Sequence, residues 1–245
     1  MNDFIYGATS YFTGFRLIAR YRLWFYFLIP ILLSIILGYS IYEIACGLSD
    51  DIGGWLVSFY PFEWGKENLE KLANTVGGIG LVAFSLLVFR YIIMAISAPF
   101  MSLLSEQLEQ KMYPDRPKTR FSIAKMLSDL VRGGRIALRN VFREILLTLL
   151  LLLMGIIIPV ISPIIPFLII FLQAYYAGFA NFDYTLERRM NVRQSVRYIR
   201  QNRMIVMGNG IVFVLSLMTV IGFLFVLPLG TAAGCVVVME DEFEY

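Results

Sequence analysis

Long apolar runs, separated by shorter polar and basic segments, dominate the pattern of this chain. The first extends from about residue 23 to 45 and the second from about 74 to 97. Each run is long enough to cross a hydrocarbon core of ~30 Å as a helix. The pattern therefore predicts two long transmembrane helices.

Two later apolar stretches are interrupted by proline-containing breaks. The stretch of about 145–180 is divided at residues 159–163, and the stretch of about 205–239 is divided at residues 228–230. The apolar arms are residues 145–158 and 164–180 in the first stretch, and 211–227 and 231–239 in the second. Each of these arms is shorter than the ~20 residues that a full helical crossing needs. We therefore expect two re-entrant helical hairpins, each returning to the side of the membrane from which it enters.

Between these stretches the pattern becomes amphipathic. Apolar side chains recur at helical spacing over 101–112, and a second amphipathic helix is predicted over about 122–143. Two stripes of arginines follow helical spacing in and after this region: Arg132, Arg135, Arg139 and Arg143, and then Arg189, Arg193, Arg197 and Arg200. By the positive-inside rule these basic segments and the N-terminus are expected in the cytoplasm. Because both hairpins return to the side that they enter, the C-terminus is expected there too.

The composition agrees with a membrane protein. Of the 245 residues, 58% are hydrophobic and only 16% are charged, whereas an ordinary soluble domain has ~25% charged residues. Polar side chains are too few to cover a soluble globule of this size. The expected fold class is therefore an all-α integral membrane protein, with a single membrane domain over residues 1–245, in a bacterial inner membrane.

No motif for enzyme chemistry is present. The chain has no histidine, and its two cysteines, Cys46 and Cys235, are far apart, so a transition metal would lack its usual ligands. A catalytic triad, a phosphate-binding loop and a dinucleotide fingerprint are all missing. We expect no enzyme activity, no metal site, no cofactor and no nucleic-acid partner.

Several polar residues lie within or beside the apolar segments. Ser162 and Thr231 stand next to turn residues, so each could begin a helix at depth and present free N–H groups to an anion, or each could cap an ordinary turn. Arg90 is the single charge of the second long segment and is a functional candidate for that reason, although its place near the helix end also suits snorkelling. Glu106 could pair with an arginine of a stripe and act as a gate.

The arginine stripes themselves allow two interpretations. They could line a vestibule that concentrates an anion through several kT of potential. They could instead set the topology and contact anionic lipid headgroups, at about 1 kcal/mol per cation near the surface. The spacing of the arginines is compatible with both roles.

Three short motifs resemble one known family. Residues 98–109 read APFMSLLSEQLE, residues 11–18 read YFTGFRLI, and Asp183 and Tyr184 follow the first predicted hairpin. Together they resemble the CysZ-type sulfate permeases, a family that shares a domain with the etoposide-induced protein of the eukaryotic endoplasmic reticulum. The resemblance implies two long helices, two hemi-penetrating helix pairs, an oligomer and uptake of sulfate for cysteine synthesis.

The chain departs from this family where an anion would bind. The family carries a Gly-x-Arg-Arg run before its first span, and the twin arginines correspond to Trp24 and Phe25 here. We expect Arg20 and Arg22 to capture the anion in their place. A family histidine after the Asp-Tyr pair corresponds to Arg189, which would form a polar control point with Glu106.

The sequence thus supports a CysZ-like permease or channel for an inorganic anion, with sulfate among the candidates. It would act as a homo-oligomer surrounded by membrane lipids. The alternative is a non-transporting membrane protein that binds lipids or partner proteins through its basic helices. A continuous wet path through the protein would favour the first hypothesis, and a closed, dry interior would favour the second.

Overall fold

The computed structural model describes residues 2–58, 93, 95–114, 123–217 and 219–243, and this part of the chain is helical throughout its regular elements. In chain order the helices are α1 (Asn2–Tyr21), α2 (Phe25–Ser58), a helix of residues 95–112, α4 (Ile123–Ile157), the 3-10 helix η1 (Pro159–Ile164), α5 (Ile165–Leu186), α6 (Val192–Gln201), α7 (Arg203–Leu217) and α8 (Val220–Phe243). The predicted all-α class is confirmed for these residues.

The chain divides into two compact units, one of Met1–Ile29 with Ser97–Tyr245 and one of Pro30–Ile96. In the second unit, α2 continues to Ser58, past the predicted end of the first span at residue 45. The second predicted span, about 74–97, lies almost wholly outside the described residues, and so does its charge Arg90. The site discussed below lies within the first unit.

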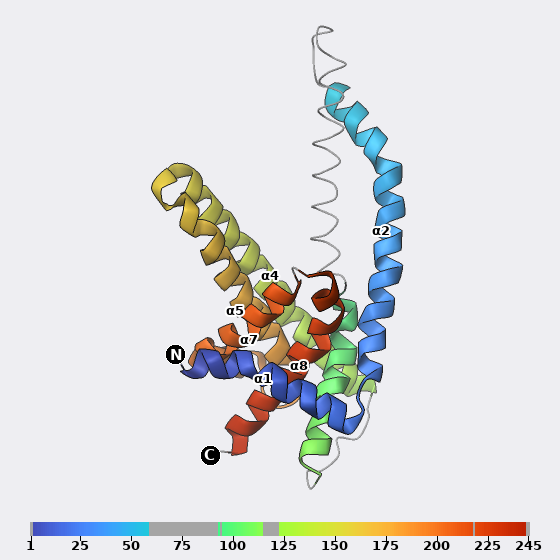
Figure 1. Cartoon of the computed structure of the whole chain (residues 1–245), viewed down its shortest axis with the longest axis vertical. Coiled ribbons are helices and arrows are strands. Elements are labelled where there is room, and N and C mark those ends of the chain that lie inside the picture. The colour runs from blue at the N-terminus through green and yellow to red at the C-terminus, as the bar shows by residue number, and fades with distance from the viewer. Residues whose placement is uncertain (1, 59–92, 94, 115–122, 218, 244–245) are drawn as a thin grey trace. The chain divides into compact units, whose positions relative to one another are not determined.

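In the first unit, α4 and α5 form a long hairpin with η1 at its tip (Figure 1). The prediction of an amphipathic helix followed by a separate short arm is wrong, because α4 continues without a break from Ile123 to Ile157. Neither proline nor glycine occurs around residues 143–145 to interrupt it. Residues Val131–Ile157 and Val160–Leu186 are each long and apolar enough to cross a membrane, by length and composition.

The second predicted hairpin turns at a different place. α7 ends at Leu217 and α8 begins at Val220, whereas the sequence predicted the turn at residues 228–230. Thr219 caps the start of α8, since its hydroxyl accepts a hydrogen bond from the backbone N–H of Gly222 at 3.0 Å. Leu224–Asp241 is the third segment that could cross a membrane by length and composition, and most of it is buried inside the protein.

Pro228 stays within α8 because burial of this helix outweighs the hydrogen bond that the proline lacks. Residues 226–239 are buried almost without interruption, against α1, α5 and α7. Helix-breaking residues are tolerated where neighbouring helices and local hydroxyl groups satisfy the backbone. The hydroxyl of Thr231 bonds to the carbonyl of Leu227 at 3.0 Å, one turn earlier in the same helix.

Glycines bring α1 and α5 into backbone contact with α7. A methyl group on Gly208 would collide with the carbonyl oxygen of Phe4 in α1, and one on Gly7 would collide with the carbonyl of Ile205. The α5–α7 crossing repeats the arrangement, with Gly178 against Val206. Small residues at crossings are the usual means by which helices in membranes approach closely.

Polar side chains add specificity to this packing. Asn181 of α5 donates a hydrogen bond from Nδ2 to Oδ1 of Asn209 in α7 at 2.8 Å, and both residues are buried. The hydroxyl of Tyr11 in α1 donates to the backbone carbonyl of Asn209 at 3.1 Å. Both α1 and α5 are thus linked to α7 by buried hydrogen bonds.

Candidate functional site

The helix of residues 95–112 contributes one polar and one apolar row of side chains to the first unit. Met101, Leu104 and Leu108 are completely buried, as their helical spacing predicts. Ser102, Ser105 and Glu109 follow each other at i, i+3 and i+7, so they lie on one face of the same helix. This polar face meets the turn that follows α5.

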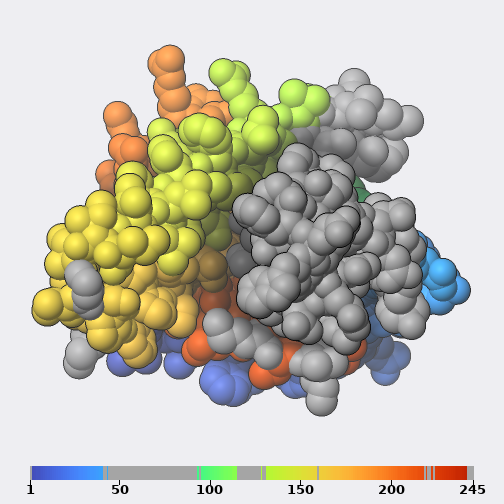
Figure 2. Space-filling model, turned by 90° about the horizontal axis from the view of Figure 1, so that it is seen from above, coloured from blue at the N-terminus to red at the C-terminus, as the bar shows by residue number. Residues whose placement is uncertain are grey.

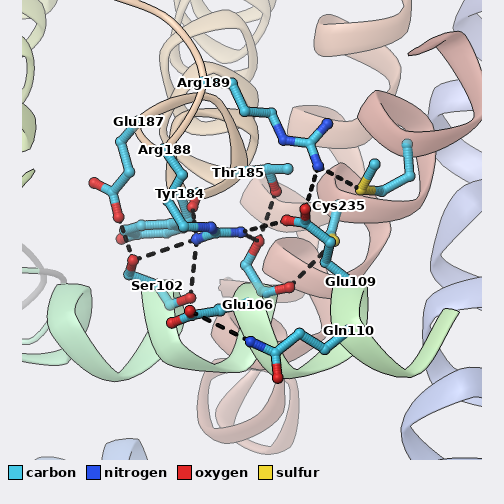
Figure 3. Close-up of polar contacts among 12 residues, drawn as sticks. Ser102, Glu106, Glu109, Gln110, Tyr184, Thr185, Glu187, Arg188, Arg189 and Cys235 are labelled. Carbon is cyan, nitrogen blue, oxygen red and sulfur yellow. Dashed lines mark hydrogen bonds and ion pairs between the residues drawn. The ribbon is translucent and has the colours of Figure 1, made fainter. Parts of the chain in front are cut away.

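Arg188, in that turn, reaches over the polar face of the 95–112 helix (Figure 3). Its Nη1 donates to the backbone carbonyls of Tyr184 at 2.7 Å and Ser102 at 3.1 Å. Its Nη2 donates to Oγ of Ser105 at 2.9 Å and to Oε2 of Glu109 at 3.2 Å. The guanidinium is therefore held in one orientation by two parts of the chain, the end of α5 and the 95–112 helix.

Arg189 binds the other oxygen of the same carboxylate. Its Nη2 donates to Oε1 of Glu109 and lies 3.1 Å from the sulfur of Met239 in α8. Two consecutive arginines thus converge on one glutamate, and each takes a different carboxylate oxygen (Figure 3). This geometry joins the 95–112 helix to the end of α5 and to α8.

Hydroxyl groups surround the ion pairs. Oγ of Ser105 and Oγ1 of Thr185 share a hydrogen bond of 2.7 Å, and both residues are buried. The hydroxyl of Ser102 donates to the carboxylate of Glu187. The thiol of Cys235 donates a weak hydrogen bond to the backbone carbonyl of Ser105 at 3.5 Å. Hydroxyl and guanidinium donors of this kind are the groups that bind oxyanions.

The arginines keep Glu109 ionised. Burial of the side chain raises its pKa, but the charges and hydrogen bonds of Arg189 and Arg188 outweigh burial and hold the pKa below its ordinary value. The side chains of Arg188, Glu109 and Arg189 are 9%, 16% and 14% exposed, so water screens these charges only in part. Because Glu109 binds both arginines, an anion could reach them both only by displacing this carboxylate.

Glu106, predicted to pair with a stripe arginine, does not do so. Its Oε1 accepts one hydrogen bond of 3.4 Å from Gln110, whereas Arg189 binds Glu109 one turn later. Sequence reasoning missed Glu109 and Arg188 as site residues. The spacing of Ser102, Ser105 and Glu109 was the signal that could have revealed the polar face.

The prediction that Ser162 and Thr231 each begin a helix within the membrane is wrong. Ser162 is exposed inside η1, and α5 begins three residues later, at Ile165, with Ile164 as an N-cap that makes no side-chain hydrogen bond. Thr231 is buried in the middle of α8, where its hydroxyl bonds back to the helix. Neither residue presents the free N–H groups of a helix start, because the helices begin elsewhere.

Arg20 and Arg22 both lie on the surface near the end of α1. Arg22 lies between α1 and α2, and its φ of 56° places its backbone in the left-handed region. The guanidinium carbon of Arg20 lies 5.8 Å from the ring centroid of Tyr21, and Nζ of Lys111 lies 5.7 Å from the same centroid. The structure therefore adds an exposed lysine from the 95–112 helix to the predicted pair.

The arginines of the two predicted stripes lie in different surroundings. Arg132 of α4 is turned inward, where it donates to Oδ1 of Asp183 at 3.4 Å and to the carbonyl of Met190 at 3.0 Å. Arg189 belongs to the turn before α6 and not to a helical stripe, since α6 starts at Val192 behind an Asn191 capping box. The other stripe residues on α6, Arg193, Arg197 and Arg200, are exposed.

Within the described ranges, no group of three or more metal-ligating side chains is found. A family model described as "Sulfate transporter CysZ/Etoposide-induced protein 2.4" matches residues 10–228. That range includes the 95–112 helix, the Arg188–Arg189 turn and most of α8. No curated protein gives a significant match to the chain.

Proposed function

The chain belongs to the family of the sulfate transporter CysZ and the etoposide-induced protein 2.4, and on this premise we propose that it is a membrane permease or channel for an inorganic anion, with sulfate as the first candidate. The convergence of Arg188 and Arg189 on Glu109 carries this proposal. A carboxylate offers two oxygens to the two guanidinium groups, and a tetrahedral oxyanion can offer the same. Glu109 would then act as an internal substitute that an entering anion displaces.

Displacement of Glu109 by the entering anion suits a protein that conducts anions better than one that binds them permanently. An empty pair of buried arginines would bind a dianion tightly and release it slowly, and conduction needs a site from which the ion can leave. Competition from Glu109 would weaken the anion's hold and return the site to neutrality after each passage. Arg20, Arg22 and the neighbouring Lys111 would collect anions from solution at the surface.

The setting of the proposal follows the sequence prediction. We place the chain, as one membrane domain, in a bacterial inner membrane, with both termini in the cytoplasm and with helical hairpins that a homo-oligomer covers. Three helices among the described residues are long and apolar enough to cross a membrane, which supports a multi-pass arrangement. Transport without chemical conversion of the anion is the activity we assign.

Uptake of radiolabelled sulfate into proteoliposomes tests the proposal, with Arg189→Gln as the decisive variant. Arg188 still pairs with Glu109 in this variant, so the fold is retained, while one charge-assisted donor to the anion is lost. Such a bond is worth ~1.5–3 kcal/mol, so sulfate affinity should fall about tenfold or more. Arg193→Gln is the matched control, since it removes the same charge from an exposed position on α6.

Glu109→Gln should have the opposite effect and tighten sulfate binding, because the internal competitor becomes neutral. Equal losses in the Arg189 and Arg193 variants would show that only general positive charge matters. No uptake and no sulfate binding by the unmodified protein would overturn the transport proposal and favour a non-transporting membrane protein.

A further inference from the structure

A second group of basic side chains gathers where α4, α5 and α6 meet, and it shares no residue with the Glu109 site. We call the following residues the arginine–tyrosine cluster: Arg139 and Arg143 of α4, Tyr175 and Tyr176 of α5, and Arg200 of α6. The guanidinium carbon of Arg139 lies 5.6 Å from the ring centroid of Phe179 in α5. The rings of Tyr175 and Tyr176 lie 5.3 Å apart in an edge-on arrangement.

Packing brings the members of the cluster together. Tyr175 packs against the apolar core that contains Phe179 and Ile199, and Ile199 is the neighbour of Arg200 along α6. Arg139 and Arg143 are one helical turn apart on α4. The charges of Arg143 and Arg200 both act on Arg139. Three guanidinium groups and two phenol hydroxyls thus share one region of the surface.

Among the residues that the structure describes, none of the three arginines of the cluster forms an ion pair with a carboxylate, although the charge of Arg139 acts on Asp183. Nη2 of Arg139 donates to the side-chain oxygen of Asn140 at 2.8 Å, while its Nε is buried without a hydrogen-bond partner. Glu144 acts electrostatically on the Tyr176 side of the cluster. Like charges held close together repel, so an external anion would stabilise this arrangement.

The cluster lies at the border of the apolar surface of the α4–α5 hairpin. Beyond Arg143 towards the tip, α4 exposes Leu146, Leu149, Leu153 and Ile156. η1 exposes Ile164, and α5 exposes Phe167, Leu168 and Phe171 before Tyr175. Tyrosines and arginines at the end of such a surface are typical of the headgroup level of a membrane. Figure 2 shows α4 in yellow-green, with orange side chains of the α6 region projecting at the same edge.

We propose that the arginine–tyrosine cluster binds the phosphate headgroup of an anionic phospholipid, whose acyl chains lie along the exposed apolar faces of α4 and α5. The unpaired guanidinium groups match the phosphate, and the adjoining leucines match the chains. A lipid satisfies both surfaces at once, whereas a free inorganic anion would use only the arginines. The inference is independent of transport by the Glu109 site.

Native mass spectrometry and thermal unfolding of the purified protein test this inference, with phosphatidylglycerol compared against phosphatidylcholine. The unmodified protein should retain phosphatidylglycerol and be stabilised by it selectively. The double variant Arg143→Gln/Arg200→Gln loses two charge-assisted donors, so its affinity for phosphatidylglycerol should fall at least tenfold. The control Arg193→Gln/Arg197→Gln removes the same charge from exposed positions of α6 and should keep the selectivity.

Melting of each variant in detergent without lipid shows whether it is folded. If the Arg143→Gln/Arg200→Gln variant is unfolded, Arg143→Lys/Arg200→Lys takes its place. Lysine keeps the positive charge but lacks the paired N–H donors of a guanidinium group, so affinity for phosphatidylglycerol should be several-fold weaker. Equal losses in the cluster and control variants would overturn the inference, as would equal retention of the two lipids by the unmodified protein. Displacement of the lipid by millimolar sulfate would assign the cluster to a free anion and also overturn it.

Discussion

Nη2 of Arg188 lies 3.2 Å from Oε2 of Glu109, and this ion pair joins the turn after α5 to the 95–112 helix. Arg189 holds the second oxygen of the carboxylate, so loss of Glu109 would leave two cations close together. Coupling between these residues is the structural basis of the first prediction. For the same reason, we expect substitution of Glu109 to change both stability and anion binding.

Glu109→Gln should lower the stability of the protein in a pH-dependent way. The pKa of Glu109 lies below its ordinary value of 4.5, so its ionised form stabilises the fold above that pH, and the contribution is lost as the pH falls through the lowered pKa. At neutral pH the loss should be about 1–3 kcal/mol, as for hydrogen bonds to charged groups. Thermal unfolding in detergent from neutral to acid pH measures the difference between the two proteins.

That difference should be constant around neutral pH and should shrink in the acid range below 4.5. Glu106→Gln serves as the control, since Glu106 contacts only Gln110 among the described residues. A difference for the Glu109 variant that grows on acidification would contradict the assignment of Glu109 as an ionised partner.

Arg20→Gln/Arg22→Gln should weaken sulfate binding at least tenfold if these residues capture the anion. Each charge-assisted hydrogen bond is worth ~1.5–3 kcal/mol, and 1.4 kcal/mol is a factor of ten. Both side chains are exposed, so folding should hardly change. Calorimetric titration with sulfate measures the effect, and unchanged affinity in a correctly inserted protein would remove the capture role.

Gly208→Ala should destabilise the protein by about 1–3 kcal/mol, in the range of overpacked cores, because the new methyl group meets the backbone of α1 and backbone cannot move aside like a side chain. Gly134→Ala on α4 is the matched control, since nothing lies within 4 Å of the added group. Exchange of glycine for alanine in an open helical position should stabilise it slightly. Thermal unfolding compares the two variants, and similar melting temperatures would contradict the close α1–α7 contact.

Both termini should lie in the cytoplasm. The basic segments favour this orientation, and the acidic residues at the end of the chain have little influence on it. A reporter fused after Tyr245 that works only in the cytoplasm should be active. Activity of a periplasm-specific reporter at the same position would instead reverse the topology.

An oligomer, with two-fold symmetry as its simplest form, is expected to cover the helical hairpins. Mass measurement in detergent and in nanodiscs should give more than one subunit per particle. A monomer under both conditions would remove this part of the proposal.

The helical class and the amphipathic pattern of residues 101–112 followed from the sequence, because the periodicity of apolar side chains is a local property of the chain. Met101, Leu104 and Leu108 could be recognised as core positions by spacing alone. The same local reasoning failed at Pro228, which looked like a turn. Burial of α8 by its neighbours, a property of the folded chain, keeps that residue in a helix.

The candidate site depended on tertiary structure in a similar way. The sequence placed Arg189 on a stripe and Glu106 at a gate, but it contains no information on the rotation of one helix relative to a turn some 80 residues away. Glu106 and Glu109 are both carboxylates of one helix, and only the packing of Met101, Leu104 and Leu108 decides which of them faces the arginines. Ionic partners distant in sequence are thus selected by the apolar contacts that orient their helices, because burial fixes the rotation of a helix before its surface charges can choose partners.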